Sequence, residues 1–161
     1  MEASTDHMTV SSSITLLDSA AITTPLAEDL RAIFTRAAEQ DGTAPLSEQA
    51  VRAVSAEGDA VHLVATAEDR IVGYAGIEPS STTGPAMAEA VVDPEFRGRG
   101  IGRRLVERAL DEGGDGARIW AHGNSAPAQA VAAALGLKIV RELLQMRRPL
   151  AGTDRAGHVA G

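Results

Sequence analysis

The chain has 161 residues, which fits one domain, and because only 2% of them are aromatic against 44% hydrophobic, its core must be aliphatic. The net charge of −7 argues against a nucleic-acid partner, which needs a basic surface, and the absence of cysteine excludes disulfides, thiolate nucleophiles and cysteine-ligated metals. No apolar run approaches the roughly 20 residues of a membrane span, and the first ten residues lack a signal-peptide pattern, so we expect a cytoplasmic location and no membrane partner.

Polar stretches lie at both ends of the chain, outside the predicted helices and strands. Residues 1–11 and 151–161 are rich in small and polar residues, so we expect flexible tails around one domain at 12–150. Pro25 suits the first turn of a helix, and Ser47 is a good N-cap for a second one. In chain order, we expect a strand at 12–18, helices at 24–41 and 48–54, a hairpin at 61–66 and 71–77 that turns at Asp69-Arg70, a strand at 86–92, a helix at 100–112, a strand at 118–121, a helix at 127–135, and strands at 137–140 and 143–148. This order predicts a mixed α/β (α+β) sheet with helices on its faces.

The turn between the strand at 86–92 and the next helix carries the clearest chemistry. A helix N-terminus has unpaired N–H groups and the positive end of the helix dipole, so it can bind an anion. Gly98, Gly100 and Gly102 let the backbone approach a phosphate closely. Arg97, Arg99 and Arg103 add positive charge at the same place. The turn therefore predicts a phosphate-binding site on an otherwise acidic chain.

Two common phosphate motifs do not fit this turn. A P-loop needs a lysine after its last glycine, and the only lysine of the chain is Lys138. A dinucleotide-binding turn has a different glycine spacing and follows the first strand of the fold. An ordinary glycine-rich turn without a ligand remains an alternative.

The turn resembles the acyl-CoA pyrophosphate loop of the GNAT superfamily. The resemblance rests on Val92-Asp93-Pro94 at the end of a strand, followed by Arg-x-x-Gly-x-Gly from Arg97 to Gly102, and it extends over about residues 14–149. It implies a single GNAT fold and acetyl-CoA as the co-substrate, with no metal. The residues that it implies for acetyl-CoA binding are Ala90, Val91 and Val92 along the pantetheine, Arg97, Gly98, Arg99, Gly100, Ile101, Gly102 and Arg103 around the pyrophosphate, and Asn124 beside the coenzyme.

The C-terminal third resembles one family within this superfamily. Trp120-Ala121-His122-Gly123, then Ala-Leu-Gly-Leu at 134–137 and the segment at 141–150 are similar to the N-terminal domain of the mycothiol synthase family. That family is a tandem of two GNAT domains and transfers acetyl to the cysteinyl amine of a cysteine–glucosamine–inositol acceptor. The chain matches one half of it. The resemblance thus implies a small amine acceptor, and a second GNAT domain or a homodimer as a partner.

The resemblance also suggests the residues for proton transfer and acceptor binding. It makes Glu89 a candidate base, whereas a surface or salt-bridged glutamate is the alternative. His122 can act as an acid or a base near neutral pH, although a histidine bonded to backbone would look the same in sequence. Glu48 is the candidate for binding the acceptor, but a carboxylate at a helix start is also favoured by the helix dipole alone.

One position departs from the superfamily pattern. Ala132, in the helix expected at 127–135, occupies the place where these enzymes usually carry a tyrosine that protonates the departing thiolate. The only tyrosine is Tyr74, on the strand expected at 71–77. Two hypotheses therefore stay open. The chain is an acetyl-CoA-dependent N-acetyltransferase of the mycothiol synthase type, or it is an acetyl-CoA-binding domain of little activity with a structural or regulatory role.

Overall fold

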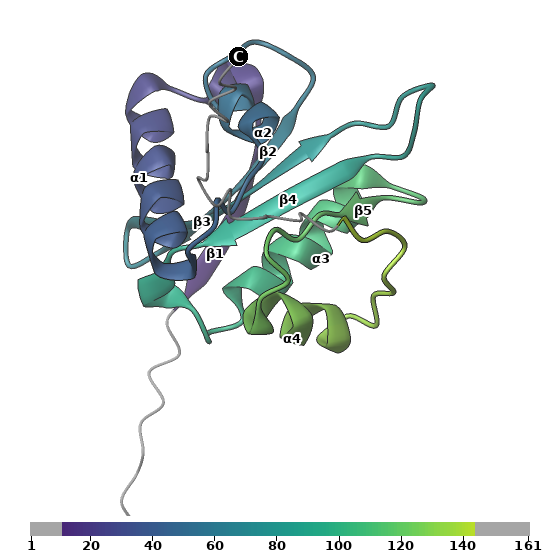
Figure 1. Ribbon diagram of the computed structural model, residues 1–161. Coiled ribbons are helices and arrows are strands. Elements are labelled where there is room, and N and C mark those ends of the chain that lie inside the picture. The colour runs from purple at the N-terminus through teal and green to yellow at the C-terminus, as the bar shows by residue number, and fades with distance from the viewer. Residues whose placement is uncertain (1–10, 144–161) are drawn as a thin grey trace, which may run out of the picture.

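The computed structural model describes residues 11–143, which form one mixed five-stranded sheet flanked by helices, as predicted (Figure 1). The strand order is β1-β2-β3-β4-β5. In chain order the elements are β1 (Ser12–Asp18), the 3-10 turn η1 (Ser19–Ala21), α1 (Thr24–Asp41), α2 (Glu48–Ala53), β2 (Val61–Ala67), β3 (Arg70–Glu78), β4 (Met87–Val92), the 3-10 turn η2 (Pro94–Phe96), α3 (Ile101–Gly113), β5 (Arg118–Ile119) and α4 (Ala126–Ala134).

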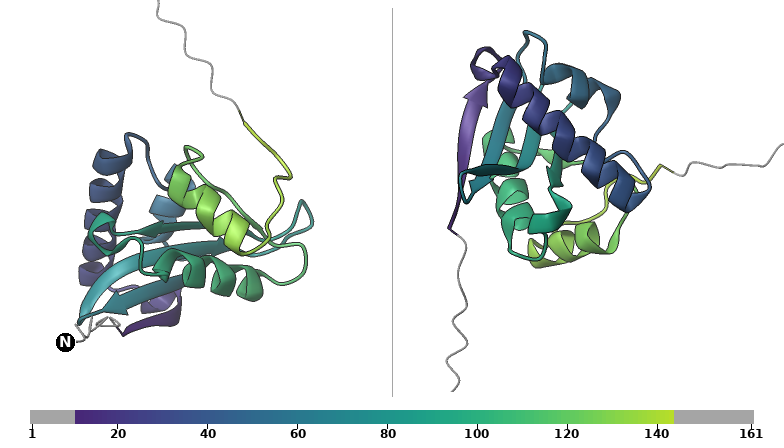
Figure 2. Two further views of the ribbon diagram at one scale, coloured as in Figure 1. Left: turned by 90° about the horizontal axis from the view of Figure 1, so that it is seen from below. Right: turned by 90° about the vertical axis from the view of Figure 1, so that its left-hand side faces the viewer.

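Helices cover both faces of the sheet, with α1 on one face and α3 on the other (Figure 2). Leu105 of α3 packs on the side of Leu63, whereas Leu30 of α1 packs on the side of Tyr74. Each of these three leucines is fully buried, and burial of one such side chain stabilises the fold by about 2 kcal/mol. Side chains alternate along a strand, so Glu89 of β4 projects toward the α1 and α2 side.

Strands β4 and β5 pair over a short stretch and then separate. They run parallel and pair only at Met87 with Arg118 and at Ala88 with Ile119, followed by a bond from the Trp120 N–H to the Ala88 carbonyl (2.8 Å). Beyond this point, the second half of β4 pairs with β3 alone, on its other side. A wedge therefore opens between β4 and the chain that follows β5.

Two local predictions are wrong. The hairpin turns at Glu68 and Asp69, which both adopt positive φ, rather than at Asp69-Arg70. Residues 137–140, predicted as a strand from their apolar character, have no regular structure, and Ile139 is 82% exposed. A strand requires a hydrogen-bonded neighbour, and no neighbour within residues 11–143 pairs with this segment. The predicted strand at 143–148 lies, apart from its first residue, outside the described residues, as do the predicted tails except Ser11.

A buried polar cluster joins η1 to the sheet. The Ser19 hydroxyl donates to the Ala60 carbonyl (3.1 Å), so its oxygen accepts from the Nε2–H of His62 (3.2 Å). The Nδ1 atom of His62 is then the acceptor for the Tyr74 hydroxyl (2.7 Å). His62 is fully buried, and this burial lowers its pKa, although the negative charge of Asp18 opposes the effect. The cluster therefore holds a neutral imidazole.

We expect this neutral histidine to make the fold less stable in mild acid. Because the folded-state pKa of His62 is lower than its unfolded value of about 6.5, the unfolded chain binds the extra proton first. The free energy of unfolding should therefore fall as the pH drops below about 6.5, by up to about 1.4 kcal/mol per pH unit. Urea unfolding of the wild type and of His62→Gln between pH 7 and 5.5 measures this slope. Equal slopes in the two proteins would show that His62 does not carry the effect.

Candidate functional site

Within residues 11–143, the turn from β4 to α3 leaves backbone amides without an acceptor. Gly98 (φ 76°) and Gly100 (φ 79°) adopt the left-handed conformation that favours glycine, and a Cβ added at either would meet no atom within 4 Å. The first helical bond of α3 runs from the Arg104 N–H to the Gly100 carbonyl (3.2 Å). Side chains cap the N-termini of α1, α2 and α4, but none caps α3. The amides of its first turn are therefore available to an anion.

A cavity of about 360 Å³ lies against this turn, in the wedge between β4 and the chain after β5. Its walls come from the second half of β4, the glycine turn, the start of α3 and the segment from Ile119 to Leu137. Of the residues predicted to bind acetyl-CoA, those in its lining are Ala90, Val91, Val92, Arg97, Gly98, Gly100, Gly102 and Arg103. The cavity thus joins a strand with unpaired backbone to an anion-binding helix start.

Arg97 holds the turn in place. Its guanidinium forms a two-point pair with Asp41, the last residue of α1, at 2.6 and 2.9 Å, and its Nε donates to the Val92 carbonyl (3.3 Å). The hydrogen bond to Asp41 raises the pKa of Arg97. Arg103 also lines the cavity, and it makes no ion pair within residues 11–143. Arg103 therefore offers a positive charge to a ligand, whereas the charge of Arg97 is already paired with that of Asp41.

Three residues predicted for acetyl-CoA binding lie outside the lining of this cavity. The Arg99 guanidinium stacks over the Phe96 ring (4.9 Å). The Ile101 side chain is buried in the core on the α3 face. The Asn124 carbonyl accepts a hydrogen bond from the Gln129 side chain (3.0 Å). Their assignment to acetyl-CoA stays a prediction.

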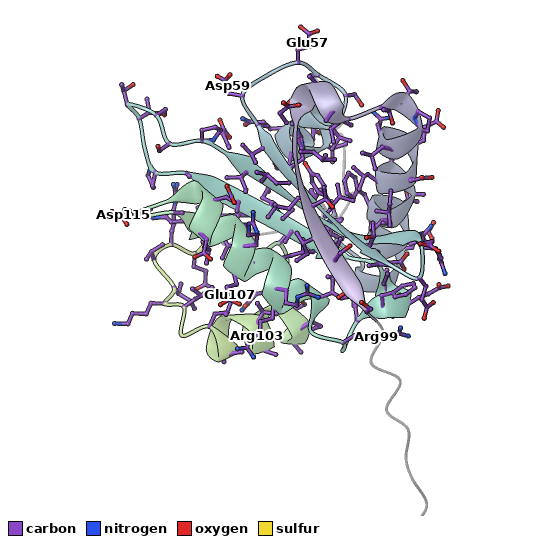
Figure 3. The ribbon with its side chains drawn as sticks, turned by 180° about the vertical axis from the view of Figure 1, so that it is seen from behind. Glu57, Asp59, Arg99, Arg103, Glu107 and Asp115 are labelled. Atoms are coloured by element: carbon purple, nitrogen blue, oxygen red, sulfur yellow. The ribbon has the colours of Figure 1, made fainter. Side chains whose placement is uncertain are left out.

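A second cavity of about 580 Å³ meets the first at Trp120 and His122, which line both. It is bounded by α2, the loop that follows α2, and the ends of β3 and β4. Among residues 11–143, its lining contains four carboxylates and no arginine or lysine. These carboxylates are Glu57, Asp59, Glu78 and Glu89. In Figure 3, Glu57 and Asp59 lie on the loop above α2, and Arg103 lies at the other end of the molecule, near α4.

Glu89 and His122 meet where the cavities join. The Nε2 atom of His122 lies 2.5 Å from Oε1 of Glu89. The same oxygen accepts from the Ser47 N–H (3.1 Å), and Oε2 accepts from the Ser47 hydroxyl (2.8 Å). Burial raises the pKa of Glu89, but the hydrogen bonds from His122 and Ser47 outweigh it and hold this pKa below its usual value. Glu89 is therefore an anion at neutral pH.

The carboxylate fixes the tautomer of the imidazole. An ionised carboxylate only accepts hydrogen bonds, so the Nε2 atom of a neutral His122 must carry the proton. Its Nδ1 atom then keeps a lone pair that can take a proton. This hydrogen-bonded carboxylate–imidazole pair is a common arrangement for a general base. The structure thus brings together the two residues predicted for proton transfer.

Other predicted features lie elsewhere. The Glu48 side chain is 89% exposed, pairs with Arg52 (3.2 Å) and lines neither cavity; its neighbours Ser47 and Gln49 line the second one. Ala132 lines the first cavity, so its wall has no hydroxyl at that position. Residues 11–143 contain no cluster of three or more metal-ligating side chains. No helix in the same range has the length and apolar character to cross a bilayer.

Sequence reasoning missed three contributors to the site. Asp41 looked like a helix end, Ser47 looked like a simple N-cap, and Trp120 was part of a motif without a stated role. Asp41 and Arg97 are 56 positions apart, and Ser47 and Glu89 are 42 positions apart. No local pattern signals such contacts, because they depend on how α1 and α2 lie over β4.

A sheet whose parallel strands separate beside an uncapped, glycine-rich helix start defines the class of GNAT acyltransferases. The sequence model of the family described as "Acetyltransferase (GNAT) domain" matches residues 58–136. ElaA from Escherichia coli shares the fold, with a TM-score of 0.62 and 19% identity over 85% of this chain and 94% of its own. The chain therefore belongs to the GNAT acetyltransferase family.

Sequence relatives indicate one family within this superfamily. Mycothiol acetyltransferase of Rhodococcus opacus (strain B4) is 61% identical over 130 residues, which are 80% of this chain and 43% of the relative. Mycothiol acetyltransferase of Mycolicibacterium smegmatis (strain ATCC 700084 / mc(2)155) is 52% identical over 122 residues, 76% of this chain and 41% of the relative. The chain thus resembles mycothiol acetyltransferases, and the matched region covers less than half of each relative.

Proposed function

We propose that this chain is an acetyl-CoA-dependent N-acetyltransferase that acts in the cytoplasm on a small amine, by resemblance the cysteinyl amine of a cysteine–glucosamine–inositol acceptor. The observation that carries the proposal is the position of His122, bonded to Glu89 and lining both cavities. A group at such a junction can reach a donor in one cavity and an acceptor in the other. Two substrates and one proton carrier are what direct acetyl transfer needs.

The first cavity suits acetyl-CoA. The amides that follow Gly98 and the charge of Arg103 would bind the pyrophosphate. The backbone of Ala90, Val91 and Val92, unpaired on the cavity side, would bind the pantetheine arm. The absence of a Cβ at Gly98 and Gly100 leaves room for the phosphates beside the turn. The residues present therefore fit this co-substrate.

The second cavity suits an amine that arrives as an ammonium ion. Its carboxylates attract the cation, and no arginine or lysine from the described part of the chain lies in its lining to oppose them. An α-amine has a pKa of about 8, so a base of modest strength can take its proton. The Nδ1 atom of His122 accepts that proton while Glu89 holds the ring and stabilises the imidazolium.

Acetyl transfer would then be a direct displacement at the thioester. The neutral amine nitrogen forms a bond to the carbonyl carbon of the thioester, the carbon–sulfur bond breaks, and the sulfur leaves with the electron pair. His122 returns one proton to the sulfur, so that the products are the amide, CoA thiol and a proton released to solvent. Because Ala132 provides no hydroxyl in the cavity wall, His122 serves both as base and as acid.

The same observation at Ala132 supports a second candidate, an acetyl-CoA-binding domain with little activity. The relatives are more than twice as long as the matched region. A second GNAT domain, or a second copy of this chain, would then complete the function.

The decisive experiment measures thiol release from acetyl-CoA. We expect turnover with a cysteine–glucosamine–inositol acceptor and none with the glucosamine–inositol analogue, which lacks the cysteinyl amine. Titration calorimetry on the same protein measures the Kd of acetyl-CoA separately. Binding without turnover of the cysteinyl acceptor would reject the enzyme and support the second candidate, whereas no binding would reject both.

A further inference from the structure

Ser47 has two roles in one side chain. Its hydroxyl oxygen accepts from the Ala50 N–H (3.2 Å) and so caps α2, while the hydroxyl proton is donated to Oε2 of Glu89 (2.8 Å). Its backbone N–H donates to the other oxygen of Glu89 (3.1 Å). A single residue thus supplies two of the three hydrogen bonds that residues 11–143 make to this carboxylate, and the third comes from His122. A helix cap alone requires neither of the bonds to Glu89.

We propose that Ser47 is a positioning residue for the acetyl transfer. It keeps Glu89 ionised and oriented toward His122, and it connects the wall of the second cavity, where the acceptor would bind, to this pair. The inference rests on the proposed function, in which Glu89 and His122 carry the proton. It adds the residue that caps α2, which is far from β4 in sequence, to the two residues that the sequence suggested.

Glu89 needs hydrogen bonds to keep its charge. Its side chain is only 12% exposed, so water does little to stabilise the anion. Without the Ser47 hydroxyl, Oε2 would lose the donor that the structure gives it. The carboxylate could then take up a proton more easily or rotate away from the imidazole. Either change would leave His122 without a fixed tautomer.

Ser47 also lies beside the wall of the second cavity that α2 provides. Gln49 and Ala50 of α2 line the second cavity, and the Gln49 amide also donates to Glu78 at the end of β3 (2.8 Å). Through its bonds to Glu89, Ser47 therefore connects one end of this wall to Glu89 and His122. Ser47 lines the second cavity but not the first. Its loss should change acceptor turnover and leave acetyl-CoA binding as it is.

The test compares Ser47→Ala with Ser47→Thr, which keeps the hydroxyl, and with Thr23→Ala. Thr23 caps α1 through the Leu26 N–H (3.3 Å) and lines neither cavity, so its variant loses a cap and nothing else. We expect kcat/KM for the acceptor to fall about 10-fold in Ser47→Ala, since the lost bond is to a charged group. Ser47→Thr and Thr23→Ala should stay close to wild type, and the Kd of acetyl-CoA should stay the same in all of them.

Carbon-13 NMR of labelled glutamate provides a readout independent of turnover. The pKa of Glu89 lies below its usual value partly because of Ser47, so Ser47→Ala should raise this pKa, and on acidification its activity should disappear at a higher pH. If Ser47→Ala and Thr23→Ala gave the same Glu89 titration and the same kcat/KM, Ser47 would be a helix cap only. A wild type without turnover would reject the reaction and the role of Ser47 in it. The NMR titration would still decide whether Ser47 holds the carboxylate.

Discussion

Replacing Gly100 by aspartate is expected to weaken acetyl-CoA binding about 100-fold, which corresponds to about 2.7 kcal/mol. The new side chain would enter the open space beside the turn, where a Cβ meets no atom within 4 Å. It would place a negative charge beside the amides that are proposed to hold the pyrophosphate, and repulsion between like charges costs several kcal/mol. Titration calorimetry with acetyl-CoA measures the change directly.

Gly100→Asn is the matched control for this prediction. Asparagine has the shape of aspartate and also tolerates the positive φ of 79° at this position. The difference between the two variants therefore isolates the charge from the conformational cost. Unchanged affinity in Gly100→Asp would show that the phosphates bind elsewhere, and equal losses in both variants would assign the effect to the backbone instead.

Replacing His122 by glutamine is expected to reduce turnover about 100-fold or more, the usual contribution of general acid–base catalysis. Glutamine can still donate a hydrogen bond to Glu89, but it cannot take up a proton. Glu89→Gln should give a similar loss, because it removes the charge that fixes the imidazole. Since the two residues act as a unit, the double variant should be about as slow as each single one. Thiol release under saturating acetyl-CoA measures all three.

Glu48→Gln is the control for this series. Its side chain is 89% exposed and lines neither cavity, so its turnover should match the wild type. A large loss in this variant would instead support the predicted contact between Glu48 and the acceptor. Wild-type turnover in His122→Gln would show that the proton leaves by another route, such as a chain of water molecules.

The parts of the fold that were predictable from sequence are those with local causes. The helix starts at Thr24-Pro25 and after Ser47 depend on neighbouring residues, and so does the turn from Gly98 to Gly102, whose glycines and arginines lie within a few positions of each other. The resemblance to the GNAT superfamily added Glu89 as a candidate base. All of these signals can be found in short windows of the chain.

The parts that could not be predicted depend on distant neighbours. Nothing near Arg97 in the sequence indicates that Asp41 would neutralise it, and nothing near Glu89 indicates that Ser47 would hold its carboxylate. The strand expected at 137–140 does not form for the same reason. Its apolar residues can form a strand only where another strand lies beside them as a hydrogen-bonding partner. Burial and pairing are properties of the assembled sheet rather than of the segment.

The separate walls of the two cavities have a kinetic consequence. Within residues 11–143, Trp120 and His122 are the residues that the two linings share, so we expect donor and acceptor to bind in separate cavities and to enter independently. Neither substrate then has to wait for the other, and CoA can depart while the acetylated product is still in place. Initial-rate plots should accordingly intersect instead of running parallel, and CoA should compete with acetyl-CoA but not with the amine.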